Sequence, residues 1–408
     1  MSQASNLIIL FAFSILISYL GGILYTRTKI PDIIWLLGFG VLIGPVLGII
    51  PPKLLNTFAP LAGVVSVTLI TFEAGMSTNL LTLTEIIGKS AALTLSTFSV
   101  LTVGVGLVSV LTIPEFQILN GLLLGTFLSG LSTVAIITIL DNLKKSIKNL
   151  ESTRAILVFD STLVDPFRIV VALTLIKVLS TPQVHFSMSL MSILRTFIVS
   201  GITGTLLGVG WMIVLHLLRK RSFNYMLTLS MLFLGYYLGE DLARNGGGTI
   251  VAFMFGILLA NRQVIVTRFG WKLRLDTERI HSFNSEIAFM LKSYYFVYLG
   301  VIANFNIEVL FAGLVLTVTI VILRFLTANI VGRAFNFTTI ERTITSLSFP
   351  LGTSAIVFSQ LPLIYGTQQL DPHIYPELVF PVVLGTVIFS SLMMPIIALY
   401  DLKPDQSK

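Results

Sequence analysis

Two acids and a base lie within one apolar stretch of the chain, residues 156–179. Asp160, Asp165 and Arg168 are separated there by apolar and hydroxyl side chains. An ionisable group at the centre of a membrane-spanning helix costs about 2.5–3.5 kcal/mol on insertion scales, so such groups usually serve a function. A carboxylate held at that depth can bind a proton or a cation and release it again.

A helix through this stretch separates the two carboxylates. Asp160 and Asp165 are five residues apart, which is about 140° around a helix, so they cannot share a face. Ser161 is four residues before Asp165, about 40° away, and lies beside it. Asp165 and Ser161 are therefore the candidate ligands for a small metal cation. Asp160 faces another way and needs a cationic partner.

Three basic residues lie within predicted membrane segments. Arg168, three residues after Asp165, could pair with it locally. Lys292 lies near a segment end, from which its long side chain can snorkel to water. Arg324 lies deep in its segment, and we expect it to pair with Asp160. Because a buried ion pair loses hydration energy, this pair is expected to fix geometry rather than add stability.

The composition places the chain in a lipid bilayer. Of 408 residues, 55% are hydrophobic and 11% are charged, whereas soluble domains carry about 25% charged residues. The absence of cysteine excludes disulfides, thiolate metal sites and cysteine nucleophiles. The net charge of +7 fits basic cytoplasmic loops, so we expect no nucleic-acid partner. No segment holds a nucleophile with its base or a cluster of metal ligands, so we expect neither an enzyme nor a cofactor.

Thirteen apolar segments are long enough to cross about 30 Å of hydrocarbon. They predict an all-α polytopic membrane protein that forms one transporter domain over residues 1–408. The segments are residues 6–26, 32–50, 58–77, 86–112, 117–140, 153–180, 189–218, 223–239, 248–261, 287–305, 308–332, 343–365 and 376–400.

The basic residues are distributed unevenly between the two sides that these segments define. With the C-terminus inside, nineteen of the 26 Lys and Arg residues lie in inner loops, and the outer loops hold only Lys53, Lys177, Arg195 and Arg244. Cytoplasmic loops carry such an excess of basic residues. We therefore expect a protein of the cell membrane with its N-terminus outside and its C-terminus in the cytoplasm.

The two halves of the chain resemble each other. Residues 39–43 (FGVLI) resemble 255–259 (FGILL), and residues 130–136 (GLSTVAI) resemble 351–357 (LGTSAIV), at offsets of 216 and about 221. Each pair lies seven segments apart, an odd number that inverts the topology. Many secondary transporters are built from such inverted repeats. The expected repeats are residues 6–180 and 223–402, with a linker helix at 186–219.

Small and hydroxylated residues interrupt the fifth and twelfth segments. Ser132 and Thr133 lie in the fifth, and Pro350 precedes a Gly-Thr-Ser run in the twelfth. Small residues allow helices to pack closely; alternatively, the helices are broken and their unwound carbonyls bind a cation. We expect two broken, crossing helices. Glu73, at the inner end of the third segment, could be solvated or belong to the site. The candidate cation- and proton-binding residues are Asp165, Ser161, Asp160, Glu73, Ser132 and Thr133.

Several of these stretches resemble one family of membrane proteins. Residues 153–157 (TRAIL) and 160–166 (DSTLVDP) resemble the sixth helix of NhaP-type monovalent cation:proton antiporters, in which Glu-Ser is followed by two residues and then Asn-Asp. Residues 72–75 (FEAG) are similar to that family's Phe-Glu-Gly-Gly. Residues 295–300 and 349–352 resemble further family stretches.

The resemblance implies an NhaA-type fold of thirteen helices and a homodimer that exchanges Na⁺, or alternatively K⁺ or Li⁺, for H⁺. By matching position, Asp165 would bind the proton and the cation, and Ser161 would be a cation ligand. Glu73 would neighbour the site, and Arg324 would pair with Asp160. Segments four to six and eleven to thirteen would move as a bundle against a dimerisation scaffold.

The chain departs from the family at four places. Asp160 stands where the family has Glu, and Val164 where it has Asn. Residues 131–133 (LST) replace Thr-Asp-Pro, and Leu351 replaces an Arg. The cation site therefore has fewer charged and polar groups than the family pattern, which leaves ion selectivity and stoichiometry open.

The expected mechanism is exchange at a single unpaired acid. A proton and a cation would compete for Asp165, and the unloaded site would carry an uncompensated charge that blocks crossing. One proton would move per cation, because Val164 cannot titrate and Asp160 is held by Arg324. The alternative is a Na⁺- or H⁺-coupled carrier of an organic solute on the same fold, since Arg168 could face an anionic substrate. A channel or a non-transporting subunit is a third reading.

Overall fold

The computed structural model is built from helices. It describes residues 3–28, 32–50, 59–78, 80–143, 147, 150–180, 186–218, 224–243, 246–264, 277–365 and 371–400. No strand occurs within these ranges, which confirms the all-α prediction for them. Much of the predicted charge asymmetry, including Lys53 and Arg244, lies outside the described residues.

The helices follow the predicted apolar segments closely. The first half of the chain forms α1 (Gln3–Thr28), α2 (Asp32–Val41) with the short π-helix η1 (Leu42–Val46), α4 (Ala59–Met76), α5 (Leu80–Thr112), α6 (Ile118–Leu128), α7 (Thr133–Leu143) and α8 (Glu151–Ser180). The second half forms α9 (Phe186–Leu217), α10 (Asn224–Ala243), α11 (Gly247–Ala260), α13 (Thr277–Val301), α14 (Ile307–Ala334), α15 (Thr339–Leu347), α16 (Thr353–Ser359), α17 (Leu361–Tyr365) and α18 (Ile374–Tyr400).

Several helices are suited to a lipid bilayer. In the described part of the chain, four stretches within α5, α9, α14 and α18 are long and apolar enough to cross a membrane, and shorter apolar helices accompany them. A helix of 20 residues spans about 30 Å, which is the thickness of the hydrocarbon core. The number of crossings, thirteen, stays a prediction.

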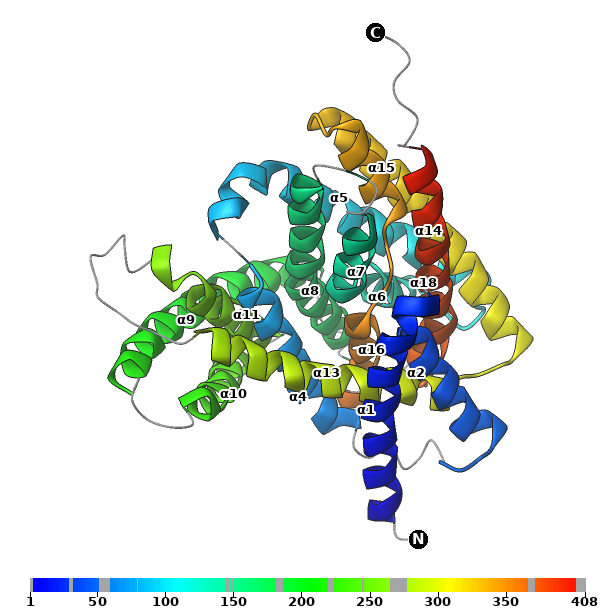
Figure 1. The fold of residues 1–408 in the computed structure, drawn as a ribbon, viewed down its shortest axis with the longest axis horizontal. Coiled ribbons are helices and arrows are strands. Elements are labelled where there is room, and N and C mark those ends of the chain that lie inside the picture. The colour runs from blue at the N-terminus through cyan, green and yellow to red at the C-terminus, as the bar shows by residue number, and fades with distance from the viewer. Residues whose placement is uncertain are drawn as a thin grey trace.

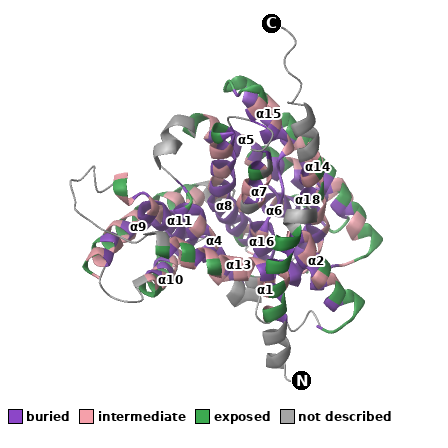
Figure 2. Ribbon diagram, viewed as in Figure 1, coloured by how far each residue is buried: buried purple, intermediate pink, exposed green. Residues whose placement is uncertain are grey.

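The helices form two packed groups. In the first, α5 packs on α6, α8 and α14, and α14 packs on α15 and α18. In the second, α11 packs on α4, α9 and α10, while α13 packs on α2 and α4. The first group lies above and to the right of the second in Figure 1. Helix α8 contacts both groups and is buried along most of its length (Figure 2), and Asp160, Asp165 and Arg168 on it lie inside the protein.

Glycines allow two helix pairs of the second group to approach closely. A Cβ on Gly40 of α2 would overlap the backbone of α13 near Gly300, and a Cβ on Gly75 of α4 would overlap the backbone of α11 near Gly256. Helices at membrane depth associate through such small residues. Gly40 and Gly256 occupy the same place in the two similar stretches 39–43 and 255–259.

Candidate functional site

Two interruptions of helical structure meet at the centre of the first group of helices. Helix α6 ends at Leu128 and α7 begins at Thr133, while α15 ends at Leu347 and α16 begins at Thr353. The two non-helical segments touch: the amide of Ser132 donates a 2.8 Å hydrogen bond to the carbonyl of Pro350. A Cβ on the glycine at 352 would overlap the Ser132 side chain. Non-helical backbone at membrane depth is tolerated only where it is buried in protein or lines a cavity.

Arg168 of α8 connects these interruptions. Its side chain is fully buried. Nε donates to the carbonyl of Thr126 at 3.1 Å, Nη2 donates to the carbonyl of Phe127, and Nη1 donates to Oγ of Ser354 at 2.9 Å. Thr126 and Phe127 are among the last four residues of α6, whose carbonyls have no partner within the helix. A cation is favourable at that end of a helix, so Arg168 satisfies both the hydrogen bonds and the helix dipole.

Asp165 is paired with this arginine. Nη1 of Arg168 lies 2.7 Å from Oδ1 of Asp165, and both side chains are buried. The prediction of a single unpaired acid was therefore wrong. Residues three apart on a helix are neighbours, and a carboxylate buried without a partner is far less stable than a paired one. The unloaded site does not carry an uncompensated charge.

The guanidinium of Arg168 fits a restricted space. Its central carbon lies 4.8 Å from the centre of the Phe358 ring, a cation–π contact that links α8 to α16. A Cβ on Gly130 would overlap the guanidinium. A side chain at position 130 would therefore have to displace the guanidinium from its place at the end of α6.

The predicted hydroxyl ligands lie at the start of α7 and beside it. Oγ1 of Thr133 donates to Oγ of Ser161 at 2.8 Å, and Ser161 donates to the carbonyl of Val158 at 2.9 Å. Oγ of Ser132 accepts a 3.3 Å hydrogen bond from the amide of Ala135. No hydrogen bond joins Ser161 directly to the Asp165 carboxylate among the described residues.

Asp160 and Arg324 lie in contact, as the sequence led us to expect. Nη2 of Arg324 is 2.7 Å from Oδ2 of Asp160, and both side chains are buried. Nε of Arg324 donates to the carbonyl of Thr345 at 3.1 Å. This arginine therefore joins α8, α14 and α15, the helix that precedes the second interruption.

Glu73 lies in a separate polar cluster. Its carboxylate accepts hydrogen bonds from the Asn284 amide and from Oγ of Ser285, the latter at 2.6 Å, and Nε2 of His281 lies 3.2 Å from Oε1. These partners all belong to α13, so the cluster joins α4 to α13. The participation of Glu73 in the cation site stays a prediction. Lys292, also on α13, pairs with Asp32 at the start of α2 at 2.7 Å.

The sequence did not reveal a further charged junction at the start of α15. Glu341 accepts hydrogen bonds from Oγ of Ser152, from the Thr338 amide at 2.8 Å and from Nζ of Lys89 at 3.3 Å. Burial raises the pKa of this carboxyl, but the hydrogen bonds and the charge of Lys89 prevail and hold it below its ordinary value. Glu341 thus ties α15 to α5 and α8. Thr338 and Glu341 also form a capping box, in which each side chain bonds to the backbone amide of the other residue. This Thr-x-x-Glu pattern is the sequence signal by which Glu341 could have been found.

Side-chain patterns could not identify the partners of Arg168. Two are backbone carbonyls, which every residue carries, and become available only because α6 ends there. The described residues contain no group of three or more histidine and acidic side chains that could hold a metal ion. The arrangement offers the buried carboxylate of Asp165 and the hydroxyls of Ser161 and Thr133, which are hydrogen-bonded to each other.

Buried charges beside non-helical backbone within a bundle of apolar helices are the architecture of a secondary transporter. The family model for the transmembrane sodium/hydrogen exchanger matches residues 12–399. The chain therefore belongs to the sodium/hydrogen exchanger family, and it is a multi-pass membrane transporter rather than an enzyme.

The fold agrees with solved structures of one archaeal protein. The chain is similar to the sodium proton antiporter MjNhaP1 from Methanocaldococcus jannaschii at pH 8, with a TM-score of 0.81, 18% identity and coverage of 96% of this chain and 100% of that one. A structure of the same antiporter from an electron-microscopy map gives a TM-score of 0.77 at 18% identity, and the match covers 100% of each chain. At this identity the likeness shows a shared fold. No curated protein sequence matches the chain significantly.

Proposed function

We propose that this protein exchanges Na⁺ for H⁺ across the cell membrane, with Asp165 as the group that binds each in turn. The observation that carries the proposal is the position of this buried carboxylate, beside two helix interruptions and bound to an arginine that also satisfies the end of α6. The family supports antiport of a cation and a proton. Sodium is the first choice because the family description names it, and K⁺ and Li⁺ are alternatives.

The two substrates exclude each other because they need the same oxygen. The hydrogen bond from Arg168 goes to Oδ1 of Asp165, so we assign the proton and the cation to Oδ2. A proton on that oxygen removes the negative charge that a cation requires. Hydroxyls of Ser161, Ser132 and Thr133 are the further oxygens that we assign to the cation when the site is loaded, with no resident cofactor.

The charge balance favours one proton per cation. Val164 beside Asp165 cannot titrate, and Asp160 is held by Arg324. Since Arg168 neutralises the unloaded site, an uncompensated charge cannot be what blocks its movement. Arg168 ties α8 to α6 and α16, which all belong to the bundle that we expect to move, so these bonds hold the bundle together as it moves.

We further propose thirteen crossings arranged as inverted repeats, residues 6–180 and 223–402, around the linker 186–219. Two related contacts support this: the second predicted segment packs on the tenth through Gly40 and Gly300, and the ninth packs on the third through Gly256 and Gly75. A two-fold axis that exchanges the repeats would produce that pairing. The hydrogen bond from Ser132 to Pro350 supports two broken helices that cross. A homodimer with its N-terminus outside and its C-terminus in the cytoplasm completes the proposal.

The carrier of an organic solute has less support. It would need Arg168 to bind an anionic substrate. The guanidinium is fully buried, and its donors already serve two carbonyls, Asp165 and Ser354. Four of its five N–H groups are thus occupied, so we retain the cation exchanger.

A cation panel tests this proposal. The purified protein in liposomes with an imposed pH gradient is exposed in turn to Na⁺, Li⁺, K⁺ and choline, and the proton flux is followed with a pH-sensitive dye at several pH values. We expect flux with Na⁺, at an unchanged membrane potential if one proton moves per cation. Proton flux that depends on none of the metal cations would overturn the proposal.

A further inference from the structure

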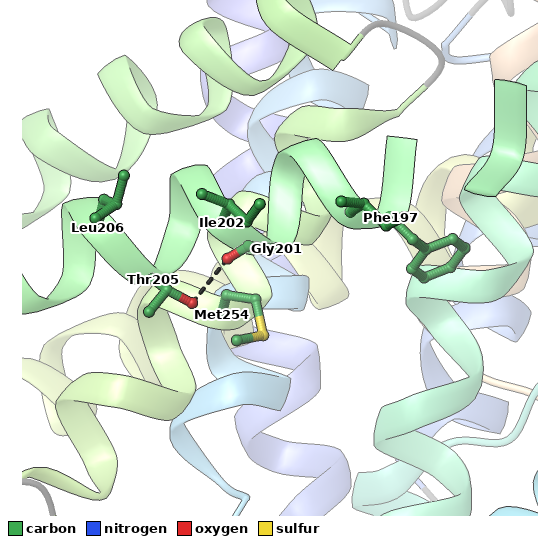
Figure 3. A pocket seen from close by; sticks show the side chains of 7 residues that line it. Phe197, Gly201, Ile202, Thr205, Leu206 and Met254 are labelled. Carbon is green, nitrogen blue, oxygen red and sulfur yellow. Dashed lines mark hydrogen bonds between the residues drawn. The ribbon is translucent and has the colours of Figure 1, made fainter. Parts of the chain in front are cut away.

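An open groove lies on the surface of α9, away from Asp165. Its volume is about 420 Å³, which is within the range of small-molecule sites. Figure 3 shows the α9 side chains along it with Met254 of α11. The lining residues are Phe197, Ile198, Gly201, Ile202, Thr205, Leu206 and Met254.

The exposed wall of the groove is apolar and suited to the hydrocarbon of a membrane. Ile198, Ile202 and Leu206 are 54%, 57% and 68% exposed, and they belong to a stretch of α9 that is long and apolar enough to cross a bilayer. A Cβ on Gly201 would meet no atom within 4 Å, so this glycine leaves the floor of the groove open. An apolar chain can therefore lie in the groove without displacing any side chain.

A cation lies at one end of the groove. Arg195 is exposed, three residues before Ile198 and seven before Ile202, which places the three on one helix face. Helix α9 has 32 residues and is about 48 Å long, against about 30 Å of hydrocarbon. Arg195 is about 14 Å from the helix start, so its side chain reaches the headgroup layer by snorkelling. No ion pair involves it among the described residues.

We propose that this groove binds an anionic phospholipid, with an acyl chain along Gly201 and the phosphate on Arg195. A guanidinium recognises phosphate through paired hydrogen bonds. A second copy of this chain is the competing occupant, and the measurements below distinguish it from a lipid. The position of the cation relative to the groove therefore favours a lipid.

The lipid would lie against the helix that carries the acid. The ring of Phe197, which lines the groove, is centred 5.0 Å from that of Phe167 on α8. Phe167 lies between Asp165 and Arg168 in the chain. Occupancy of the groove would thus restrict Phe197 and, through it, the part of α8 that holds the ion pair.

Lipid binding to the purified protein tests the proposal without a transport assay. Binding of fluorescent phosphatidylglycerol and phosphatidylcholine is measured in detergent for the wild type and for Gly201→Leu, which fills the groove. Gly210→Leu is the matched control, because Gly210 also lies on α9 with no atom within 4 Å of a Cβ. We expect Gly201→Leu to weaken phosphatidylglycerol binding about tenfold or more and the control to leave it unchanged.

The charge is tested in the same assay. Arg195→Gln should abolish the preference for phosphatidylglycerol over phosphatidylcholine, and Lys177→Gln, at an exposed position on α8, should retain it. The proposal would be overturned if Gly201→Leu and Arg195→Gln both bound phosphatidylglycerol with the affinity and the preference of the wild type. So would a change in the dimer fraction of Gly201→Leu without a change in lipid affinity, which would assign the groove to a second copy.

Discussion

The guanidinium of Arg168 lies 2.7 Å from the carboxylate of Asp165, one turn earlier on the same helix. The same guanidinium donates hydrogen bonds to two backbone carbonyls at the end of α6. One side chain thus compensates both a buried acid and an interrupted helix. The region around Asp165 is therefore held together by a charge on α8 itself, and a cation that binds Asp165, as we propose, would lie beside that fixed charge.

Removing this arginine should destabilise the fold. Arg168→Gln leaves the Asp165 carboxylate buried without its cation and the carbonyls of Thr126 and Phe127 without their donor. Breaking a buried ion pair in this way costs about 3–5 kcal/mol. Thermal unfolding in detergent should show a clearly lower Tm, with a smaller loss for Arg168→Lys, which keeps the charge. An unchanged Tm for Arg168→Gln would mean that the pair does not support the fold.

The pair of Asp160 and Arg324 should behave as a coupled unit. Each single change, Asp160→Asn or Arg324→Gln, leaves one buried charge unpaired, whereas the double change leaves none. We expect the double variant to lose less stability than the sum of the two single losses, with a coupling of about 0.5–3 kcal/mol. Free energies of unfolding of the four proteins, from denaturant titrations, give this value. Additive losses would contradict a direct interaction.

A methyl group at position 130 should disturb the site. Gly130→Ala places a Cβ against the guanidinium of Arg168, and overpacking of this kind costs about 1–3 kcal/mol. Transport by the variant should fall together with its Tm. Gly88→Ala is the control, since Gly88 is exposed on α5 and a Cβ there meets no atom within 4 Å. Equal behaviour of the two variants would argue against a tight fit around Arg168.

Glu341 should make stability depend on acid pH. Its pKa in the folded protein is held below the ordinary value of 4.5. A depressed carboxyl pKa adds stability above the unfolded-state value, and this contribution is lost as the pH falls through the folded-state value. Wild-type Tm should therefore decline below about pH 4.5 more steeply than the Tm of Glu341→Gln. Parallel pH profiles for the two proteins would show that Glu341 contributes no such linkage.

The fold was largely predictable because hydrophobicity fixes where helices lie in a membrane. Each of the thirteen apolar segments overlaps helix in the described part of the chain. The contact of Asp160 with Arg324 was predictable for a similar reason: a charge deep in an apolar segment needs a partner of opposite sign, and few were available.

The local environment of Asp165 was not predictable to the same extent. Sequence spacing placed Ser161 and Arg168 both within reach of Asp165, and it could not decide between them. In the structure Arg168 is the partner of Asp165. The carbonyls of Thr126 and Phe127 accept hydrogen bonds from the Arg168 guanidinium and so hold it in the interior, where it contacts Asp165. Similarly, Glu73 lies on an apolar helix, but its partners on α13 depend on packing that no local pattern encodes.

Cation-driven proton flux through Asp165→Asn is the most direct measurement of the central claim. The variant keeps the shape of the side chain but can neither bind a proton nor supply a negative charge. In liposomes with a pH gradient, addition of Na⁺ should produce flux with the wild type and with Asp241→Asn, a control at an exposed acid of α10, and none with Asp165→Asn. Undiminished exchange by correctly folded Asp165→Asn protein would contradict the account.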